Sequence, residues 1–196
     1  MPRVIAGICG GIPLAAPRGE KTRPTADKVK EALFSVLQPR LYDASFLDLF
    51  SGSGQIGVEA LSRGARRVVF VDKSHESREI TLKNLEKTGL LASSRFICAD
   101  VVRGLRELGR QEESFDIIYM DPPYDRAREF IGKMAPILLS EGILAPRGSL
   151  IVEHRSTDSM VENVMNLTLY RCCKYGLTML TFYSTEVREE EVTKFK

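Results

Sequence analysis

The chain has 196 residues, of which 43% are hydrophobic and 28% charged, and its net charge is +2. This composition is typical of a globular protein and argues against an extensively disordered chain, and the length suffices for one principal domain with its own core. No apolar stretch is long enough to span a membrane and the N-terminus lacks a signal-peptide pattern, so we expect a cytoplasmic protein without a membrane span.

The segment 1–40 carries seven Lys or Arg against three acidic residues, a basic excess that suits the phosphates of a nucleic acid. Two short apolar segments, 3–7 and 12–16, predict a small hairpin. A charged loop rich in Pro and Gly follows at 17–25, and the pattern of 26–38 predicts a helix. We interpret residues 1–40 as an appendage on the substrate side, because so short a segment cannot bury a core of its own.

From residue 45 onward, β-branched runs alternate with amphipathic stretches. The predicted strands are 45–50, 67–72, 95–100, a run from 114 that ends in a double proline, and 148–155. The predicted helices are 55–64, 74–90, 101–111 and 126–140, and 168–184 predicts a hairpin that turns at Gly176. This alternation predicts an α/β core over 41–185 with a mostly parallel seven-stranded sheet, an antiparallel C-terminal edge strand and helices on both faces, followed by a charged tail over 186–196.

A glycine-rich turn follows the first core strand and reads Asp48-Leu-Phe-Ser-Gly52-Ser-Gly54-Gln-Ile-Gly57. Glycines at this spacing, between a strand and a helix, let the backbone turn sharply and approach a ligand closely. Asp72 ends the next strand, where a carboxylate accepts hydrogen bonds from ribose hydroxyls. The turn therefore predicts a site for an adenosine-type cofactor.

The same geometry serves nicotinamide and flavin cofactors, but three features favour S-adenosylmethionine. Asp48 precedes the glycines, where it would hold the ammonium group of a methionine moiety. Asp100 ends the third strand, where it would accept from the adenine amino group. The fourth strand ends in Asp121-Pro-Pro-Tyr124, a segment suited to holding an amine.

Methylating an exocyclic base amine is difficult because the nitrogen lone pair is delocalised into the ring. Two acceptors on the two N–H groups draw this lone pair out of the ring plane, and the Asp121 carboxylate with the Pro122 carbonyl forms such a pair. Pro122 and Pro123 fix φ and remove backbone donors, which stiffens the segment. Tyr124 offers a ring on which a base stacks, worth ~1–3 kcal/mol.

These motifs, in this order, resemble the Rossmann-like class I amino-methyltransferases. The start of the chain is similar to the RsmD family of bacterial 16S ribosomal RNA guanine-N2 methyltransferases, through Arg3-Val-Ile-Ala-Gly7, Arg23-Pro-Thr25 and Glu31-Ala-Leu-Phe34. The tail resembles that family in Lys174-Tyr-Gly176 and Leu180-Thr-Phe-Tyr183, so the likeness covers nearly all of 1–184. One departure is the first hairpin turn, Ile8 to Ile12, which lacks the basic and aromatic residues that family members often carry.

The resemblance implies methyl transfer from S-adenosylmethionine, with S-adenosylhomocysteine as product, to a guanine N2 amine of 16S rRNA. Its expected partner is the small ribosomal subunit or an assembly intermediate, and we expect a monomer without metal. The expected cofactor-binding residues are Asp48, Phe50, Ser51, Gly52, Gly54, Asp72, Lys73, Asp100 and Asp121. The expected catalytic residues are Asp121, Pro122, Pro123 and Tyr124, and the expected substrate-binding residues are Arg18, Lys21, Arg23, Pro24, Thr25 and Tyr124.

Other functions stay open at this point. An adenine-N6 methyltransferase on DNA or RNA would use the same segment, Asp121-Pro-Pro-Tyr124, which we call the acceptor motif. A non-catalytic nucleic-acid-binding protein would share the fold, since fold alone does not prove activity. An NAD-dependent oxidoreductase is disfavoured because no convincing catalytic residue follows the glycine turn.

Overall fold

The computed structural model describes residues 2–17, 24–123 and 126–186. The chain divides into two compact units, Met1–Gly104 and Leu105–Lys196. Among the described helices, none is long and apolar enough to cross a membrane. All four cysteines are free thiols.

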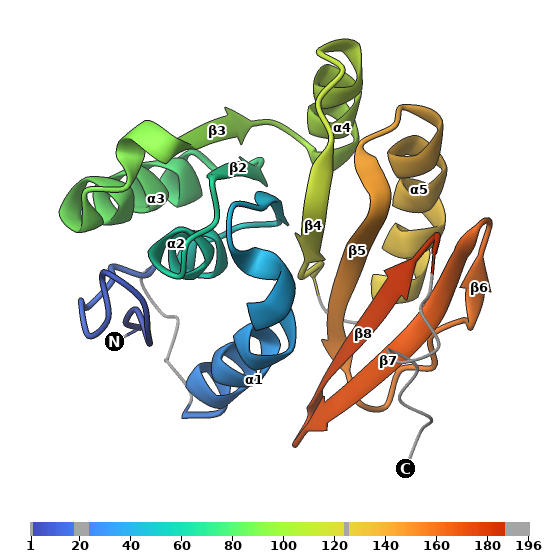
Figure 1. Cartoon of the computed structure of the whole chain (residues 1–196), viewed down its shortest axis with the longest axis horizontal. Helices are drawn as coiled ribbons and strands as arrows, with labels where there is room; N and C mark the ends of the chain where they lie inside the picture. The colour runs from blue at the N-terminus through green and yellow to red at the C-terminus, as the bar shows by residue number, and fades with distance from the viewer. Residues whose placement is uncertain (1, 18–23, 124–125, 187–196) are drawn as a thin grey trace. The chain divides into compact units, whose positions relative to one another are not determined.

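The first unit contains three parallel strands in the order β3-β2-β1 (Figure 1). Its elements in chain order are α1 Pro24–Leu41, β1 Ser45–Leu49, α2 Gln55–Ser62, β2 Arg67–Asp72, α3 His75–Thr88, the 3-10 helix η1 Leu91–Ser93 and β3 Ser94–Cys98. Helix α3 agrees with the predicted helix 74–90: the Ser74 hydroxyl accepts from the Ser77 amide, and Gly89 ends the helix at φ 70°. Every residue of β1 is buried, as its apolar run predicts.

The second unit contains five strands in the order β4-β5-β8-β7-β6 (Figure 1). Its elements are β4 Phe115–Met120, α5 Ala127–Ser140, β5 Leu144–Arg155, β6 Asn163–Val164, β7 Leu167–Tyr175 and β8 Thr178–Ser184, and helix α4, Val101–Arg110, begins in the first unit and ends in this one. Strands β4 and β5 are parallel, whereas β8 pairs antiparallel with both β5 and β7. Gly176, at φ 62°, allows the turn between β7 and β8.

The predicted α/β fold class is confirmed, with parallel strands joined through helices and antiparallel strands at the C-terminal end. Two details differ. The described residues form eight strands instead of seven, because the short β6 has too few residues to show a periodicity. Strand β5 also begins at Leu144, ahead of the predicted start at Gly148, since a bulge around Arg147 (φ 62°) lets the strand cross a Pro-Arg-Gly segment.

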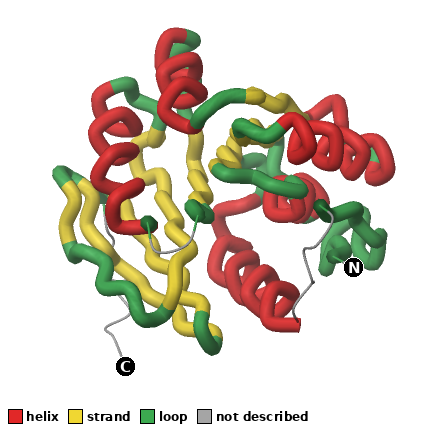
Figure 2. Tube along the Cα trace, turned by 180° about the vertical axis from the view of Figure 1, so that it is seen from behind, coloured by secondary structure: helices red, strands yellow, loops and turns green. Residues whose placement is uncertain are grey.

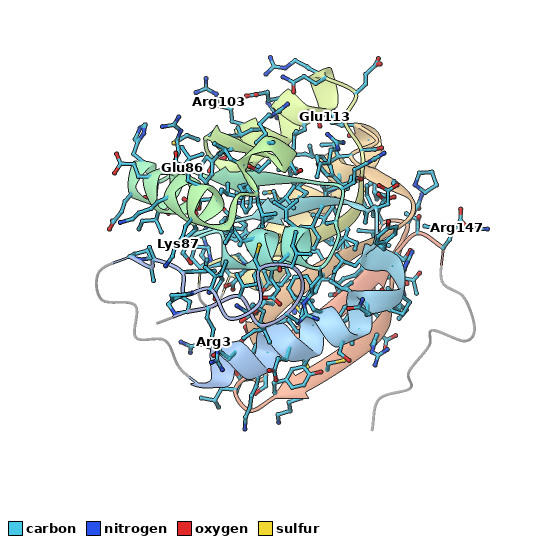
Figure 3. All side chains as sticks on the ribbon, turned by 60° about the vertical axis from the view of Figure 1, so that its left-hand side comes forward. Arg3, Glu86, Lys87, Arg103, Glu113 and Arg147 are labelled. Carbon is cyan, nitrogen blue, oxygen red and sulfur yellow. The ribbon has the colours of Figure 1, made fainter. Side chains whose placement is uncertain are left out.

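The predicted N-terminal hairpin is reduced to one isolated antiparallel bridge, between Arg3 and Pro13. Backbone hydrogen bonds also join its two segments, from the Val4 amide to the Ile12 carbonyl and from the Leu14 amide to the Pro2 carbonyl. The pairing extends no further because the amides of Ile5 and Ala6 donate to the carboxylate of Glu59 on α2, and Pro13 has no N–H. The segment lies against α2 and α3 (Figures 1 and 2), where the Ile8 amide donates to a carbonyl at the end of α2. Lys87 of α3, labelled in Figure 3, donates to the Pro13 carbonyl.

The predicted division at residue 40 stays a prediction, because the two compact units follow a different boundary. The tail over 187–196 lies outside the described residues.

Candidate functional site

The glycine-rich turn of the first unit runs from Phe50 to Gly54, between β1 and α2. Phe50, Gly52 and Gly54 all adopt positive φ, at 60°, 52° and 71°. The amides of Phe50 and Ser51 donate to the Val71 carbonyl, and the Gly54 amide donates to the Ser51 carbonyl. Three residues with left-handed backbone conformation in a five-residue segment make a sharp turn between strand and helix. The glycine spacing predicts such a turn.

The three glycines of the motif play two different roles. A Cβ at Gly57 would lie 2.2 Å from the Phe70 ring, and one at Gly54 would lie 2.6 Å from Thr81, so these glycines allow close packing of helix on strand and of loop on helix. A Cβ at Gly52 would meet nothing within 4 Å. Gly52 therefore borders open space, as a residue that faces a ligand does.

Asp72 is fixed at the end of β2 by backbone donors. One carboxylate oxygen accepts from the Gly52 amide at 2.9 Å, and the other accepts from the Ser74 amide at 2.8 Å. Each carboxylate oxygen has a second lone pair, so the group keeps the capacity to accept from ribose hydroxyls. The side chain is half-buried, and the neighbouring Lys73 is exposed.

Ser51 carries a buried hydroxyl that has no hydrogen-bond partner within the described part of the chain. Buried polar groups are nearly always satisfied, so an unsatisfied one marks a place where a ligand or water completes the bonding. This orphaned hydroxyl and the open space beside Gly52 lie in the same short turn. Together they fit a polar cofactor against the turn.

Asp48 lies beneath the turn, with a side chain only 1% exposed. Its carboxylate accepts from the amide of Gly57, in the first turn of α2, at 3.0 Å. Burial raises the pKa of Asp48 to about 8, and the nearby charge of Asp72 also raises it, against the opposing effect of the Gly57 hydrogen bond. A cation placed beside this carboxylate would favour its ionised form.

The raised pKa predicts a pH-dependent stability difference between the wild type and Asp48→Asn. Between about pH 4 and about pH 8 the unfolded chain loses the Asp48 proton while the folded protein keeps it, so the contribution of Asp48 to stability falls as pH rises. Asparagine retains an oxygen for the Gly57 amide and does not ionise. Urea denaturation of the cofactor-free proteins should therefore show the variant gaining stability relative to the wild type from pH 5 to pH 8. A difference that stays constant over this range would contradict the raised pKa.

Asp100, predicted to contact adenine, is exposed and caps α4. Its carboxylate accepts from the Val102 amide at 3.0 Å, and its carbonyl accepts from the Gly104 amide. The residue thus has a structural role that explains an acid at this position without a ligand. Contact with adenine stays a prediction.

Two residues of α3 that the sequence analysis missed hold the glycine turn from behind. The Thr81 hydroxyl donates to the Gly52 carbonyl at 3.2 Å, and the Asn84 amide donates to the Ser53 carbonyl at 2.9 Å. Asn84 also exchanges two hydrogen bonds with the backbone of Ala15. Both side chains are fully buried, and polar residues three apart on the inner face of a predicted helix are the signal that would have found them.

The acceptor motif belongs to the second unit and follows β4 directly. Asp121 is exposed, Pro122 is buried and Pro123 is exposed. Tyr124 lies outside the described residues, as do Arg18, Lys21 and Arg23. Pro24 and Thr25 begin α1, not a loop, and their side chains also lie outside the description.

Comparison with known proteins identifies the group to which this chain is similar. The family model described as conserved hypothetical protein 95 matches residues 2–184. A candidate rRNA methyltransferase of Bacillus subtilis, YlbH, is 34% identical over 181 residues, which are 92% of this chain and 97% of the relative. Ribosomal RNA small subunit methyltransferase D of Escherichia coli K12 is 30% identical over 188 residues, covering 96% of this chain and 92% of the relative.

Solved structures agree with the fold. A candidate methyltransferase of Escherichia coli, YhhF, has a TM-score of 0.79 and 30% identity, covering 95% of this chain and 98% of that chain. A structure complexed with S-adenosylhomocysteine has a TM-score of 0.65 and covers 83% of this chain and 50% of its own, and at 18% identity it supports the fold alone.

Proposed function

Because this chain belongs to the RsmD family, whose model is described as conserved hypothetical protein 95, we propose that it transfers a methyl group from S-adenosylmethionine to the N2 amine of a guanine in 16S rRNA. The substrate would be the small ribosomal subunit or an assembly intermediate. The enzyme would act as a monomer in the cytoplasm. The observation that carries the proposal is the glycine turn, where open space at Gly52, the orphaned Ser51 hydroxyl and the fixed Asp72 carboxylate coincide.

The residues of the turn fit S-adenosylmethionine better than a pyrophosphate cofactor. Asp72 accepts from the ribose hydroxyls while the Gly52 and Ser74 amides hold its carboxylate in place. The buried Asp48, whose pKa is raised to about 8, would ionise beside the cofactor's ammonium group, and an anionic pyrophosphate would instead oppose that ionisation. Phe50, Gly54, Lys73 and Asp100 complete the proposed cofactor-binding set.

When bound, S-adenosylmethionine supplies an electrophilic methyl group on a sulfonium. The chain's own task is to bind the amine, orient it and raise its nucleophilicity. Asp121 and the Pro122 carbonyl accept the two N–H bonds, Pro123 stiffens the segment, and Tyr124 stacks on the base. These groups are preorganised for positive charge that develops on the amine nitrogen as the methyl group arrives.

Replacing Gly52 with valine should weaken S-adenosylmethionine binding on the order of 100-fold or more, because the new side chain would occupy the space that the ligand needs. Gly89→Val is the matched control, since Gly89 also has positive φ, also borders open space, and lies at the far end of α3. Both variants carry similar backbone strain, and isothermal titration calorimetry should separate them by affinity. Equal affinities for S-adenosylmethionine in the two variants would contradict the proposal that the glycine turn binds the cofactor.

An adenine-N6 methyltransferase is the alternative that shares this mechanism. Mass spectrometry of nucleosides from treated RNA and DNA distinguishes the two, because N2-methylguanosine and N6-methyladenosine differ in mass and in retention. The names of the relatives favour ribosomal RNA as the substrate.

A further inference from the structure

Glu153 of β5 is a half-buried carboxylate that the proposed mechanism does not use. The hydroxyl of Tyr119, on the neighbouring strand β4, donates to its Oε2 atom. Across the described residues this is the one hydrogen bond that the Glu153 carboxylate makes, so Oε1 remains available as an acceptor. Tyr119 is itself buried, at 2% exposure, and holds the carboxylate in one orientation.

The register of β4 and β5 brings Glu153 level with the acceptor motif. The two strands are parallel, with Tyr119 paired to Ile151 and Met120 paired to Val152. Asp121, the first residue after β4, and Glu153 of β5 follow this last pair. Glu153 therefore stands at the carboxyl end of β5, beside the segment that we propose holds the amine.

Two opposing effects act on the Glu153 carboxyl group, and the hydrogen bond from Tyr119 favours its ionised, accepting form. Burial raises the pKa of Glu153, and the hydrogen bond from Tyr119 opposes that rise by stabilising the ionised form. His154, the next residue, is engaged with strand β8, where its Nε2 atom lies 2.7 Å from the Thr181 hydroxyl. An ionised carboxylate with one occupied oxygen offers the other to a single further donor.

We propose that Glu153 is the residue that selects guanine, by accepting a hydrogen bond from the base's N1–H while Asp121 holds the N2 amine. This inference rests on the proposed function. Guanine carries an N–H beside its amine-bearing carbon, whereas adenine and cytosine carry a ring nitrogen with a lone pair at the corresponding place. A carboxylate beside the amine site therefore attracts guanine and repels the other two bases.

The test compares guanine with 2-aminopurine, which keeps the 2-amine and replaces N1–H with a lone pair. The substrate is 16S rRNA ligated from synthetic and transcribed pieces, with either base at the nucleotide that methyl labelling identifies. The wild type should favour guanine in kcat/KM by at least about 100-fold, because with 2-aminopurine the carboxylate of Glu153 is left facing a lone pair. Glu153→Gln should reduce this preference at least about 10-fold, because the Tyr119 hydroxyl retains the amide oxygen and leaves the amide N–H for the base.

Two comparisons keep the outcome specific to N1. 2-Aminopurine also lacks the 6-oxo group, which by itself could alter kcat/KM. The quantity that tests Glu153 is therefore the change in the guanine preference between the wild type and Glu153→Gln. Tyr119→Phe keeps the carboxylate but loses the hydrogen bond that orients it, so its preference for guanine should lie between those of the wild type and Glu153→Gln. Cofactor affinity measured by calorimetry confirms that each variant is folded.

A wild type that methylates both bases within about threefold, or a Glu153→Gln variant with the wild-type preference, would overturn the role of Glu153 and leave the proposed function intact. Failure to label guanine in any rRNA would overturn both.

Discussion

Asp121→Ala is expected to slow methyl transfer by about 100- to 1,000-fold while the variant still binds S-adenosylmethionine, with a much smaller loss of affinity than of rate. Loss of one preorganised group that stabilises developing charge typically has an effect of this size. Asp121 is exposed and follows a buried strand, so its replacement should perturb packing little. Single-turnover rates with saturating cofactor measure the first quantity, and calorimetry measures the second.

Asp116→Ala is the control for this experiment, since Asp116 is an exposed aspartate on the same strand and outside the proposed site. It should retain the wild-type rate. An Asp121→Ala variant with a normal rate would show that the carboxylate does not hold the amine, and another acceptor would have to be sought.

Glu59→Ala is expected to reduce the free energy of unfolding by about 3–5 kcal/mol, the cost of removing one partner from a buried ion pair. Glu59 is completely buried on α2 and accepts from the amides of Ile5 and Ala6. Its carboxylate also accepts from Arg63 Nε at 2.7 Å and lies 3.5 Å from Lys30 Nζ, whose side chain is 1% exposed. One carboxylate therefore joins α1, α2 and the N-terminal segment.

Lys30 explains why the loss is large. Burial lowers the pKa of Lys30, and the charge of Glu59 is the main effect that opposes this. Without Glu59, the ammonium group stays buried with the Arg3 carbonyl as its hydrogen-bond partner. Urea denaturation at pH 7 should show the full loss in Glu59→Ala, and adding Lys30→Met should recover part of it. A loss below about 1 kcal/mol would contradict the buried ion pair as the source of this stability.

The parts of the structure that depend on neighbouring residues could be predicted from the sequence. The capping of α3 by Ser74 and Gly89 is local, and so is the turn at Gly52 and Gly54, because hydrogen bonds between close neighbours and positive φ fix them. The position of Asp72 at the carboxyl end of β2 could also be predicted, because the strand itself is clear from the sequence. Each of these was found where the pattern placed it.

Features that depend on distant partners could not be predicted. Glu59 lies in a short helix where its charge suggests a solvent-facing position, and its partners Ile5 and Lys30 belong to the N-terminal segment and to α1, far away in the sequence. The same network takes the amides of Ile5 and Ala6, which is why the predicted N-terminal hairpin is limited to a short antiparallel pairing. Asn84 likewise has its role only because Ala15 returns to α3. Asp100 is the opposite case: the sequence predicts contact with a ligand, and the structure shows a local capping hydrogen bond to the Val102 amide.

The most direct test of the central claim is a methyl-transfer assay with labelled S-adenosylmethionine and three separate acceptors: small ribosomal subunits that lack their modifications, naked 16S rRNA and duplex DNA. The account predicts labelled N2-methylguanosine from one or both ribosomal substrates. Label in N6-methyladenosine, or no label in any acceptor despite cofactor binding, would contradict it.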